Sequence, residues 1–196
     1  MDLSTLNAYD SKADAFAEDW ETQPAPVDLQ ELLCHWFRPG PTADIGCGSG
    51  RDTAWLAANG FPAVGYDASP GLLAEARRRH PGLDFRLSPL PELPGVEEGS
   101  LTNVLCETVV MHLEPSSLAA SLHRLLAVLA PGGTLFLSWR ITEGADRRDD
   151  HGRLYAVVDA QAVRDCLAAA ELLLDEESVN ASSGARVHRI VARKRG

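Results

Sequence analysis

The chain has 196 residues, a length that suits one α/β domain with a substantial core and leaves no room for a second full domain. Its formal net charge of −10 argues against a broad nucleic-acid surface, which needs clustered Lys and Arg side chains. No apolar run approaches the roughly 20 residues that cross a bilayer, and residues 1–10 lack the features of a signal peptide, so we expect a cytoplasmic protein with no membrane partner.

The N-terminal residues predict helices before the first strand. Apolar residues recur at helical spacing at Tyr9, Ala13, Phe16 and Trp20. A second amphipathic stretch covers 29–37 and ends at the helix-breaking run Pro39-Gly40-Pro41. We therefore expect a helical N-terminal cap over residues 1–40 and the main domain over residues 41–196.

From residue 42 onward, short apolar runs alternate with helical patterns. The expected strands are 42–46, 62–66, 83–87, 101–106, 134–139, 172–178 and 186–193. The expected helices are 51–59, 70–79, 116–129 and 160–170. This alternation predicts an α/β fold with a mainly parallel sheet and helices on both faces. The last connection, 180–185, is too short for a crossover helix, so the final strand should run antiparallel.

One connection stands out by its composition. Residues 142–153 are polar and charged, and they show no helical or strand periodicity. Long connections of this kind often cover binding sites. We therefore expect a mobile loop over a site.

A glycine-rich turn follows the first expected strand. Gly46, Gly48 and Gly50 alternate with other residues, and Asp44 stands two residues ahead of the first glycine. A strand that turns through glycines into a helix brings bare N–H groups and the positive helix end against a ligand. Asp67 closes the next apolar run, where a carboxylate typically binds ribose hydroxyls. The spacing is G-x-G-x-G and not G-x-G-x-x-G, which disfavours a nicotinamide-dependent oxidoreductase.

Three segments in order resemble one family. They are Asp44 to Gly50, Gly65 to Ser69, and the turn Leu129-Ala130-Pro131-Gly132-Gly133-Thr134-Leu135. From about residue 42 to residue 139 the chain is similar to small-molecule class I S-adenosylmethionine-dependent methyltransferases. The resemblance implies a Rossmann-like sheet of seven strands with an antiparallel last strand. It also implies S-adenosylmethionine as the cofactor and methyl transfer to a small molecule by in-line displacement.

The resemblance implies a set of cofactor-binding residues. In this family the glycine loop passes under the methionine part, and the acid after the second strand binds the ribose. The residues expected at the cofactor are Asp44, Gly46, Cys47, Gly48, Gly50, Arg51, Asp67, Ala68, Ser88, Leu90, Cys106 and Glu107. Pro89 stands where the family usually has an acid that holds the adenine amino group. Ser88, the Leu90 backbone or water would then replace that bond, at a loss of about 1.5–3 kcal/mol.

Two residues after the fourth strand are candidate general bases. A base is needed only if the methyl acceptor carries a proton on its nucleophilic atom. His112 is one candidate, and its alternative is a structural role before the next helix. Glu107 is the other, and it could instead bind the methionine end of the cofactor, contact the substrate or be an ordinary solvated carboxylate.

The expected substrate-binding residues come from the cap and from the region around the polar loop. They are Tyr9, Trp20, Trp139, Arg140 and Tyr155. Tyr9 and Trp20 could alternatively be core residues of the cap. Arg140 could clamp a carboxylate or phosphate, or form a salt bridge with Glu143, Asp146 or Asp149.

Other functions remain open. The chain could methylate protein or RNA, although its acidic balance disfavours RNA. It could also bind S-adenosylmethionine without catalysis, an alternative that Pro89 suggests. We expect no metal site, because the histidines and the four cysteines lack ligand spacing. The sequence predicts neither the acceptor nor the oligomeric state.

Overall fold

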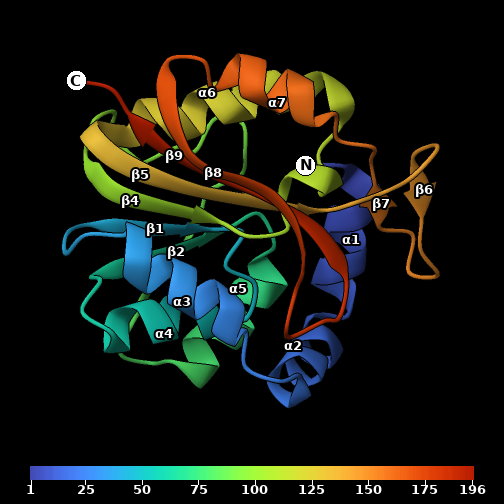
Figure 1. Ribbon diagram of the computed structural model, residues 1–196. Helices are drawn as coiled ribbons and strands as arrows, with labels where there is room; N and C mark the ends of the chain where they lie inside the picture. Colours follow the sequence, from blue (N-terminus) through green and yellow to red (C-terminus); the bar gives the residue numbers. More distant parts are fainter.

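A seven-stranded sheet separates two layers of helices in the computed structural model, which describes residues 1–196 (Figure 1). The strand order is β3-β2-β1-β4-β5-β9-β8. The strands are β1 Thr42–Ile45, β2 Ala63–Asp67, β3 Asp84–Leu87, β4 Leu101–Cys106, β5 Leu129–Arg140, β8 Ala170–Val179 and β9 Arg186–Lys194. The helices are α1 Leu3–Ser11, α2 Ala13–Thr22, α3 Val27–Trp36, α4 Arg51–Ala58, α5 Pro70–Arg79, α6 Leu118–Val128 and α7 Ala160–Cys166.

The strand directions confirm the predicted sheet. β1 pairs in parallel with β2 and β4, and β5 continues the parallel ladder beside β4. β9 runs antiparallel to both of its neighbours, β5 and β8. The short connection 180–185 therefore forms a hairpin, as its length predicts.

The helices cover both faces, and α3 lies on the sheet itself. α3, α4 and α5 lie on one side, and α6 and α7 on the other (Figure 1). Leu29 and Leu33 of α3 pack with Phe136 and Val191 of the sheet in one buried cluster. The boundary between a cap over residues 1–40 and a main domain over residues 41–196 stays a prediction. Of the three N-terminal helices, α1 and α2 lie at the edge of the sheet where the glycine loop begins.

The first helical stretch differs from the expectation. Its apolar spacing continues from Tyr9 to Trp20, but the structure divides it into α1 and α2 at Lys12, whose backbone is not helical. Asp10 explains the break, because its carboxylate accepts hydrogen bonds from the Gly71 N–H and the Ser69 hydroxyl at the start of α5. These bonds hold the end of α1 against α5.

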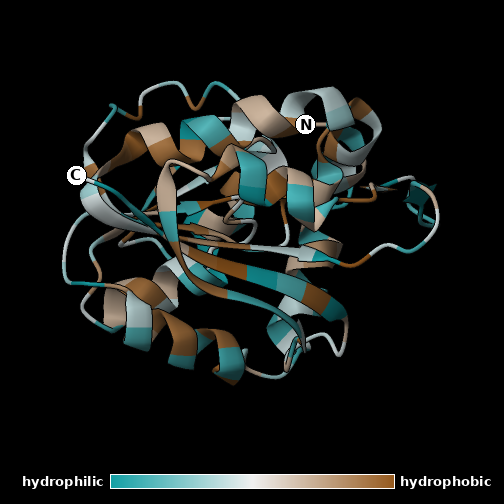
Figure 2. Cartoon of the chain, turned by 45° about the horizontal axis from the view of Figure 1, so that its top comes forward, coloured by the Kyte–Doolittle hydropathy of each residue, from teal (hydrophilic) through white to brown (hydrophobic).

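Two connections also depart from the expected elements. The polar segment contains a short hairpin, in which β6 Arg147–Arg148 pairs with β7 Leu154–Tyr155. The hairpin projects beside α1 and its tip is hydrophilic (Figure 2). Both guanidinium donors of Arg148 bind the Asp2 carboxylate at 2.8 Å, so the segment is attached to the N-terminus. β5 begins at Leu129, five residues earlier than expected, with a register shift against β4 between Leu101 and Asn103.

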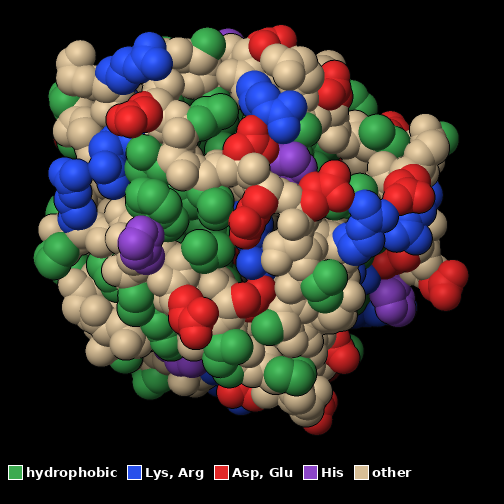
Figure 3. All heavy atoms as spheres, in the orientation of Figure 1, with side chains coloured by type: hydrophobic (Ala, Val, Ile, Leu, Met, Phe, Trp, Pro, Cys, Tyr) green, Lys and Arg blue, Asp and Glu red, His purple; other side chains and the backbone are tan.

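The distribution of charged side chains on the surface agrees with the negative net charge of the sequence. Acidic and basic side chains are interspersed over the face in Figure 3 and do not form one continuous basic patch there. No helix has the length and apolar character that a membrane span requires. The cysteines are all free, and Cys34 is exposed while Cys47 and Cys106 are buried.

Replacement of Leu33 by Ala should destabilise the fold strongly. Leu33 is 1% exposed between α3 and the sheet, so truncation leaves a cavity that costs about 2–5 kcal/mol. Leu3, which is 74% exposed, provides the same substitution outside the core, with an expected cost within about 0.5 kcal/mol. Urea unfolding measures both. Equal losses in the two variants would contradict the packing of α3 on the sheet.

Candidate functional site

A cavity opens at the carboxyl edge of the sheet, where β1, β2, β4 and β5 end. It encloses about 880 Å³, including the part open to solvent. Its walls come from the glycine loop, the ends of β2, β4 and β5, helices α1 and α2, and the β8–β9 hairpin. Its lining residues are Met1, Tyr9, Trp20, Gly46, Cys47, Gly48, Ser49, Arg51, Asp52, Asp67, Leu72, Glu107, Thr108, Val109, His112, Arg140, Asn180, Ser182 and Ser183.

The glycine loop forms the floor of this cavity. Gly46 and Gly48 have φ angles of +76° and +54°, which favour glycine over any residue with a side chain. A Cβ atom on Gly48 would lie 2.8 Å from the Trp20 ring, and one on Gly46 would lie 2.2 Å from Val109. Glycine is therefore required at both positions, because Trp20 and Val109 pack directly against the loop backbone. Gly50 differs, since a Cβ atom there would meet Phe85 and His80 outside the cavity.

Asp67 lies at the end of β2 and fixes the loop. One carboxylate oxygen accepts the Gly48 N–H at 2.9 Å, and the other accepts the Ser69 N–H at 2.8 Å. Burial raises the pKa of Asp67, while these N–H bonds oppose that shift. Each oxygen retains a lone pair toward the cavity, which suits a pair of vicinal hydroxyl groups.

Asp44 supports the loop from below and does not line the cavity. It is 3% exposed, and the Thr53 hydroxyl donates to its carboxylate at 2.6 Å. Burial raises the pKa of Asp44 to about 8. The structure therefore places Asp44 beneath the glycines, where a ligand contact would need the loop to move.

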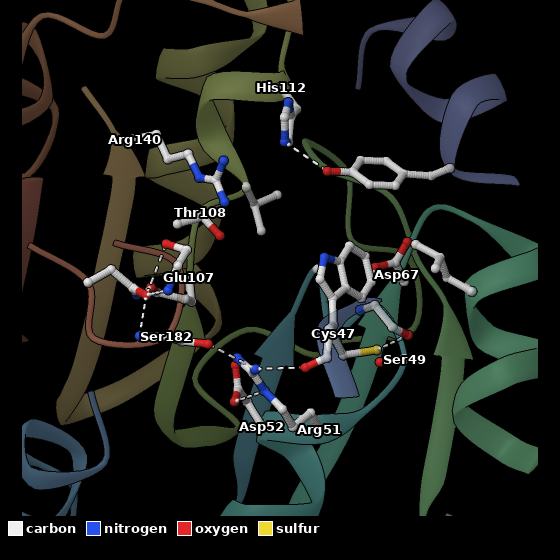
Figure 4. A pocket seen from close by; sticks show the side chains of 18 of the residues that line it. Cys47, Ser49, Arg51, Asp52, Asp67, Glu107, Thr108, His112, Arg140 and Ser182 are labelled. Carbon is white, nitrogen blue, oxygen red and sulfur yellow. Dashed lines mark hydrogen bonds and ion pairs between the residues drawn. The ribbon is translucent and has the colours of Figure 1, made fainter. Parts of the chain in front are cut away.

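Glu107 stands at the end of β4 and points into the cavity (Figure 4). The Ser138 hydroxyl donates to one of its oxygens, and the Asn180 side-chain amide donates to the other at 3.1 Å. Burial raises the pKa of Glu107 to about 7. Asn180 comes from the β8–β9 hairpin, so the hairpin helps to build the site.

Arg51 connects three parts of the wall. Its guanidinium donates to the Trp20 carbonyl at 3.3 Å and to the Ser182 hydroxyl at 3.2 Å (Figure 4). It also pairs with Asp52 at 3.3 Å. Arg51 therefore holds α2 and the β8–β9 hairpin against the helix that follows the glycine loop.

His112 and Tyr9 form a buried pair at the cavity. The Nδ1 atom of His112 lies 2.5 Å from the Leu154 carbonyl, and its Nε2 atom lies 3.1 Å from the Tyr9 hydroxyl. A carbonyl only accepts, so Nδ1 carries the proton and Nε2 accepts from Tyr9. Burial lowers the pKa of His112 to about 4, so the imidazole is neutral near pH 7. Arg153 donates to the Tyr9 oxygen at 3.2 Å.

Arg140 reaches the cavity from the end of β5, and the alternative salt bridge is wrong. Glu143 pairs with Arg186 at 2.6 Å, and Asp149 pairs with Arg153 at 2.6 Å. The third candidate, Asp146, accepts a hydrogen bond from the Val157 N–H. Arg140 itself forms no salt bridge.

Two other expected substrate residues do not line the cavity. Successive strand residues point to opposite faces, so Trp139 turns away from Arg140 and stacks on His188 with ring centres 4.6 Å apart. Tyr155 is buried beneath Arg140, whose guanidinium carbon lies 5.9 Å from the ring centre. Tyr9 and Trp20 do line the cavity.

Four of the residues expected at the cofactor, three of them around adenine, also lie outside the lining. The Ser88 hydroxyl donates to the Pro94 carbonyl at 2.9 Å, and Leu90 and Cys106 are buried. Ala68 is likewise absent from the wall, and Leu72 of α5 is present instead. Leu72, Thr108, Asn180 and Ser182 line the cavity as well, although nothing in their local sequence pattern shows which cavity they reach.

Sequence comparisons connect this site with methyltransferases. Residues 43–133 match the family model of a methyltransferase domain. A trans-aconitate 2-methyltransferase of Methylobacterium nodulans is 40% identical over 124 residues, which cover 60% of this chain and 44% of that protein. A ubiquinone biosynthesis O-methyltransferase of Methylococcus capsulatus is 35% identical over 119 residues, 58% of this chain and 49% of the relative. The chain thus spans about half the length of the curated relatives it matches.

Solved structures share the whole fold. The Burkholderia thailandensis 1,6-didemethyltoxoflavin-N1-methyltransferase, solved with 1,6-didemethyltoxoflavin and S-adenosylhomocysteine, superposes with a TM-score of 0.77 and 23% identity. The match covers 98% of this chain and 88% of that chain. A methyltransferase of Anabaena variabilis superposes with a TM-score of 0.77 and 18% identity over 99% and 96% of the two chains. These likenesses confirm the Rossmann-like fold.

Substitution of Glu107 by Gln should change how stability depends on pH. The pKa of Glu107 rises from 4.5 in the ordinary case to about 7 in the folded protein. Between these values the folded protein keeps a proton that the unfolded chain releases, so wild-type stability should fall as the pH rises. Gln does not titrate, and relative to wild type the variant should gain about 1–3 kcal/mol from pH 4.5 to 7.5. Urea unfolding at several pH values measures this, and parallel pH profiles would contradict it.

Proposed function

Because the chain belongs to the class I S-adenosylmethionine-dependent methyltransferases, we propose that it transfers a methyl group from S-adenosylmethionine to a small-molecule acceptor. The observation that carries this proposal is the joint position of Asp67 and the glycine loop at one cavity. A carboxylate with free lone pairs lies beside a loop in which every second residue is a glycine. This combination fits a ribose diol attached to an extended chain.

The residues that line the cavity fit the ribose and methionine parts of the cofactor, and the fit is weaker around the adenine. Asp67 would bind the ribose hydroxyls, and Gly46, Cys47 and Gly48 would line the methionine part. Arg51 would bind the carboxylate of that part, and Glu107 its ammonium group. Ser88, Leu90, Ala68 and Cys106 would contribute only after a local movement, because their side chains lie outside the wall. Leu72 offers an apolar contact for adenine in their place.

The catalytic demands on the protein are modest. The bound cofactor supplies an electrophilic methyl group on a sulfonium, whose departure as a neutral thioether needs no acid. The protein must orient the acceptor in line with that methyl group and exclude water. Helices α1 and α2 and the β8–β9 hairpin cover the cavity and would serve this purpose. This division of labour is consistent with residues 1–40 containing a cap.

Two groups could remove a proton from an acceptor that carries one. His112 is neutral and its Nε2 atom accepts from Tyr9, so a proton could pass through the Tyr9 hydroxyl to His112. Glu107, with a pKa of about 7, is partly ionised at neutral pH and faces the same cavity. Such a positioned base contributes about 10²–10⁴-fold to the rate.

A small molecule is the acceptor that the relatives and the cavity favour. The relatives named above are a trans-aconitate 2-methyltransferase and a ubiquinone biosynthesis O-methyltransferase, both of which act on small molecules, and α1, α2 and the β8–β9 hairpin border the cavity. The acidic surface offers no footprint for RNA. The cytoplasmic location and the absence of a nucleic-acid partner stay predictions.

Calorimetric titration with S-adenosylhomocysteine tests the cofactor. We expect binding to the wild-type protein and at least about tenfold weaker binding to a Gly48→Ala variant, because the added methyl group meets Trp20 and crowds the loop. Gly60→Ala is the matched control: Gly60 also has a positive φ, of +87°, but has open space around it. Both variants should lose stability because of the positive φ, Gly48→Ala the more because its methyl group also meets Trp20, and only Gly48→Ala should lose affinity.

Absence of any binding to S-adenosylhomocysteine or S-adenosylmethionine would overturn the proposed function. Tight binding of NADH in the same titration would also contradict it, since the glycine spacing disfavours a dinucleotide.

A further inference from the structure

Charged side chains of both signs line the cavity. Asp52, Asp67 and Glu107 line it from the glycine-loop helix and from the ends of β2 and β4. Arg140 points in from the end of β5, apart from Asp52 and Asp67, near His112 (Figure 4). Under the proposed function Asp67 and Glu107 bind the ribose and ammonium groups of the cofactor, and Arg51 binds its carboxylate. Arg140 has no role in that binding.

Arg140 has no partner within the protein. Its guanidinium makes no hydrogen bond and no ion pair, and its nearest aromatic contact is the Tyr155 ring at 5.9 Å. The neighbouring carboxylates Glu143 and Asp149 bind other arginines. A guanidinium that lines the cavity without a protein partner is available to a ligand, and its charge-assisted hydrogen bonds favour an anion.

A second unpartnered donor lies in the same wall. Thr108 has a φ angle of +54°, a conformation that β-branched residues rarely adopt. Its backbone N–H donates to the carbonyl and hydroxyl oxygens of Ser138, at 3.2 and 3.1 Å, which holds the strained turn in place. Its hydroxyl has no hydrogen-bond partner and belongs to the cavity lining. Strain of this kind is concentrated at functional sites.

The charges around His112 leave Arg140 uncompensated. Arg153 pairs with Asp149 at 2.6 Å, and its guanidinium carbon lies 5.8 Å from the centre of the same Tyr155 ring. Arg140 and Arg153 both oppose protonation of His112 and lower its pKa, whereas Asp149 has the opposite effect. Because Arg153 and Asp149 offset each other, Arg140 is the unpaired charge of this group, and it favours an anion.

We propose that the methyl acceptor carries a carboxylate, that Arg140 binds it through its planar pair of N–H groups, and that Thr108 adds a hydroxyl donor. This inference rests on the proposed function, because it assigns the acceptor to the part of the cavity that the cofactor leaves free. Arg140 matches a carboxylate because both groups are planar and form two parallel hydrogen bonds. The carboxylate anchors the acceptor, and the proposal adds no covalent step.

Ligand-observed NMR on the protein saturated with S-adenosylhomocysteine tests the inference. The probes are small mono-, di- and tricarboxylic acids, each paired with its uncharged primary amide. We expect acids to bind and their amides to bind at least about tenfold more weakly, because the charge-assisted bidentate bond is lost. Acids that bind no better than their amides, or that do not bind, would overturn the inference.

Substitutions at two arginines test which side chain binds the carboxylate. Arg140→Gln should weaken acid binding at least about tenfold. Arg140→Lys keeps the positive charge but loses the planar pair of N–H groups, and it should weaken binding less. Arg147→Gln is the matched control, since Arg147 lies 5.2 Å from the same Tyr155 ring but outside the cavity lining. It should change affinity by less than about twofold if Arg140 makes the contact and a general positive field does not. Equal effects of the Arg140 and Arg147 variants would contradict the assignment.

The test separates the two proposals. Binding of S-adenosylhomocysteine in every variant shows that each is folded and that the cofactor assignment holds. If the cofactor analogue binds and acids show no preference, the acceptor inference alone fails. If the analogue does not bind, the proposed function fails as well.

Discussion

The carboxylate of Asp67 joins the glycine loop to the end of β2, and the rest of the site is arranged around this junction. It accepts one N–H from each side, from Gly48 and from Ser69. Because both oxygens are engaged by backbone donors, the carboxylate cannot rotate without breaking the loop geometry. The lone pairs that remain therefore have fixed directions. The loop in turn sets the floor against which α2 packs, since Trp20 occupies the space next to Gly48.

Segments that are distant in the sequence close the cavity above this floor. Arg51 binds the α2 carbonyl of Trp20 and the hairpin hydroxyl of Ser182, while Asn180 of the same hairpin binds Glu107. At the other end, Arg148 holds the N-terminus through Asp2. The walls of the cavity are therefore held together by these polar contacts between segments. The buried core of the sheet supports the segments from below.

The sequence predicts the fold well because its signals are local. Alternating apolar runs locate the seven strands, and the short connection before β9 predicts its antiparallel direction. The glycine spacing and Asp67 locate one side of the site for the same reason. Asn180, Ser182 and Thr108 could not be found in this way, since their roles depend on how distant loops meet. Trp139 shows the limit within a strand: its position at the end of the expected strand 134–139 does not tell which of the two alternating faces meets the cavity, and Arg140 lines the cavity in its place.

The central claim is that Asp67 and the glycine loop bind the cofactor of a methyltransferase. A crystal structure of the protein grown with S-adenosylhomocysteine tests it most directly. The account predicts that both ribose hydroxyls lie within hydrogen-bond distance of the Asp67 carboxylate, with the methionine part over Gly46 and Gly48. It also predicts that Arg140 stays clear of the cofactor. A ligand bound elsewhere, or one whose ribose does not contact Asp67, would contradict the account.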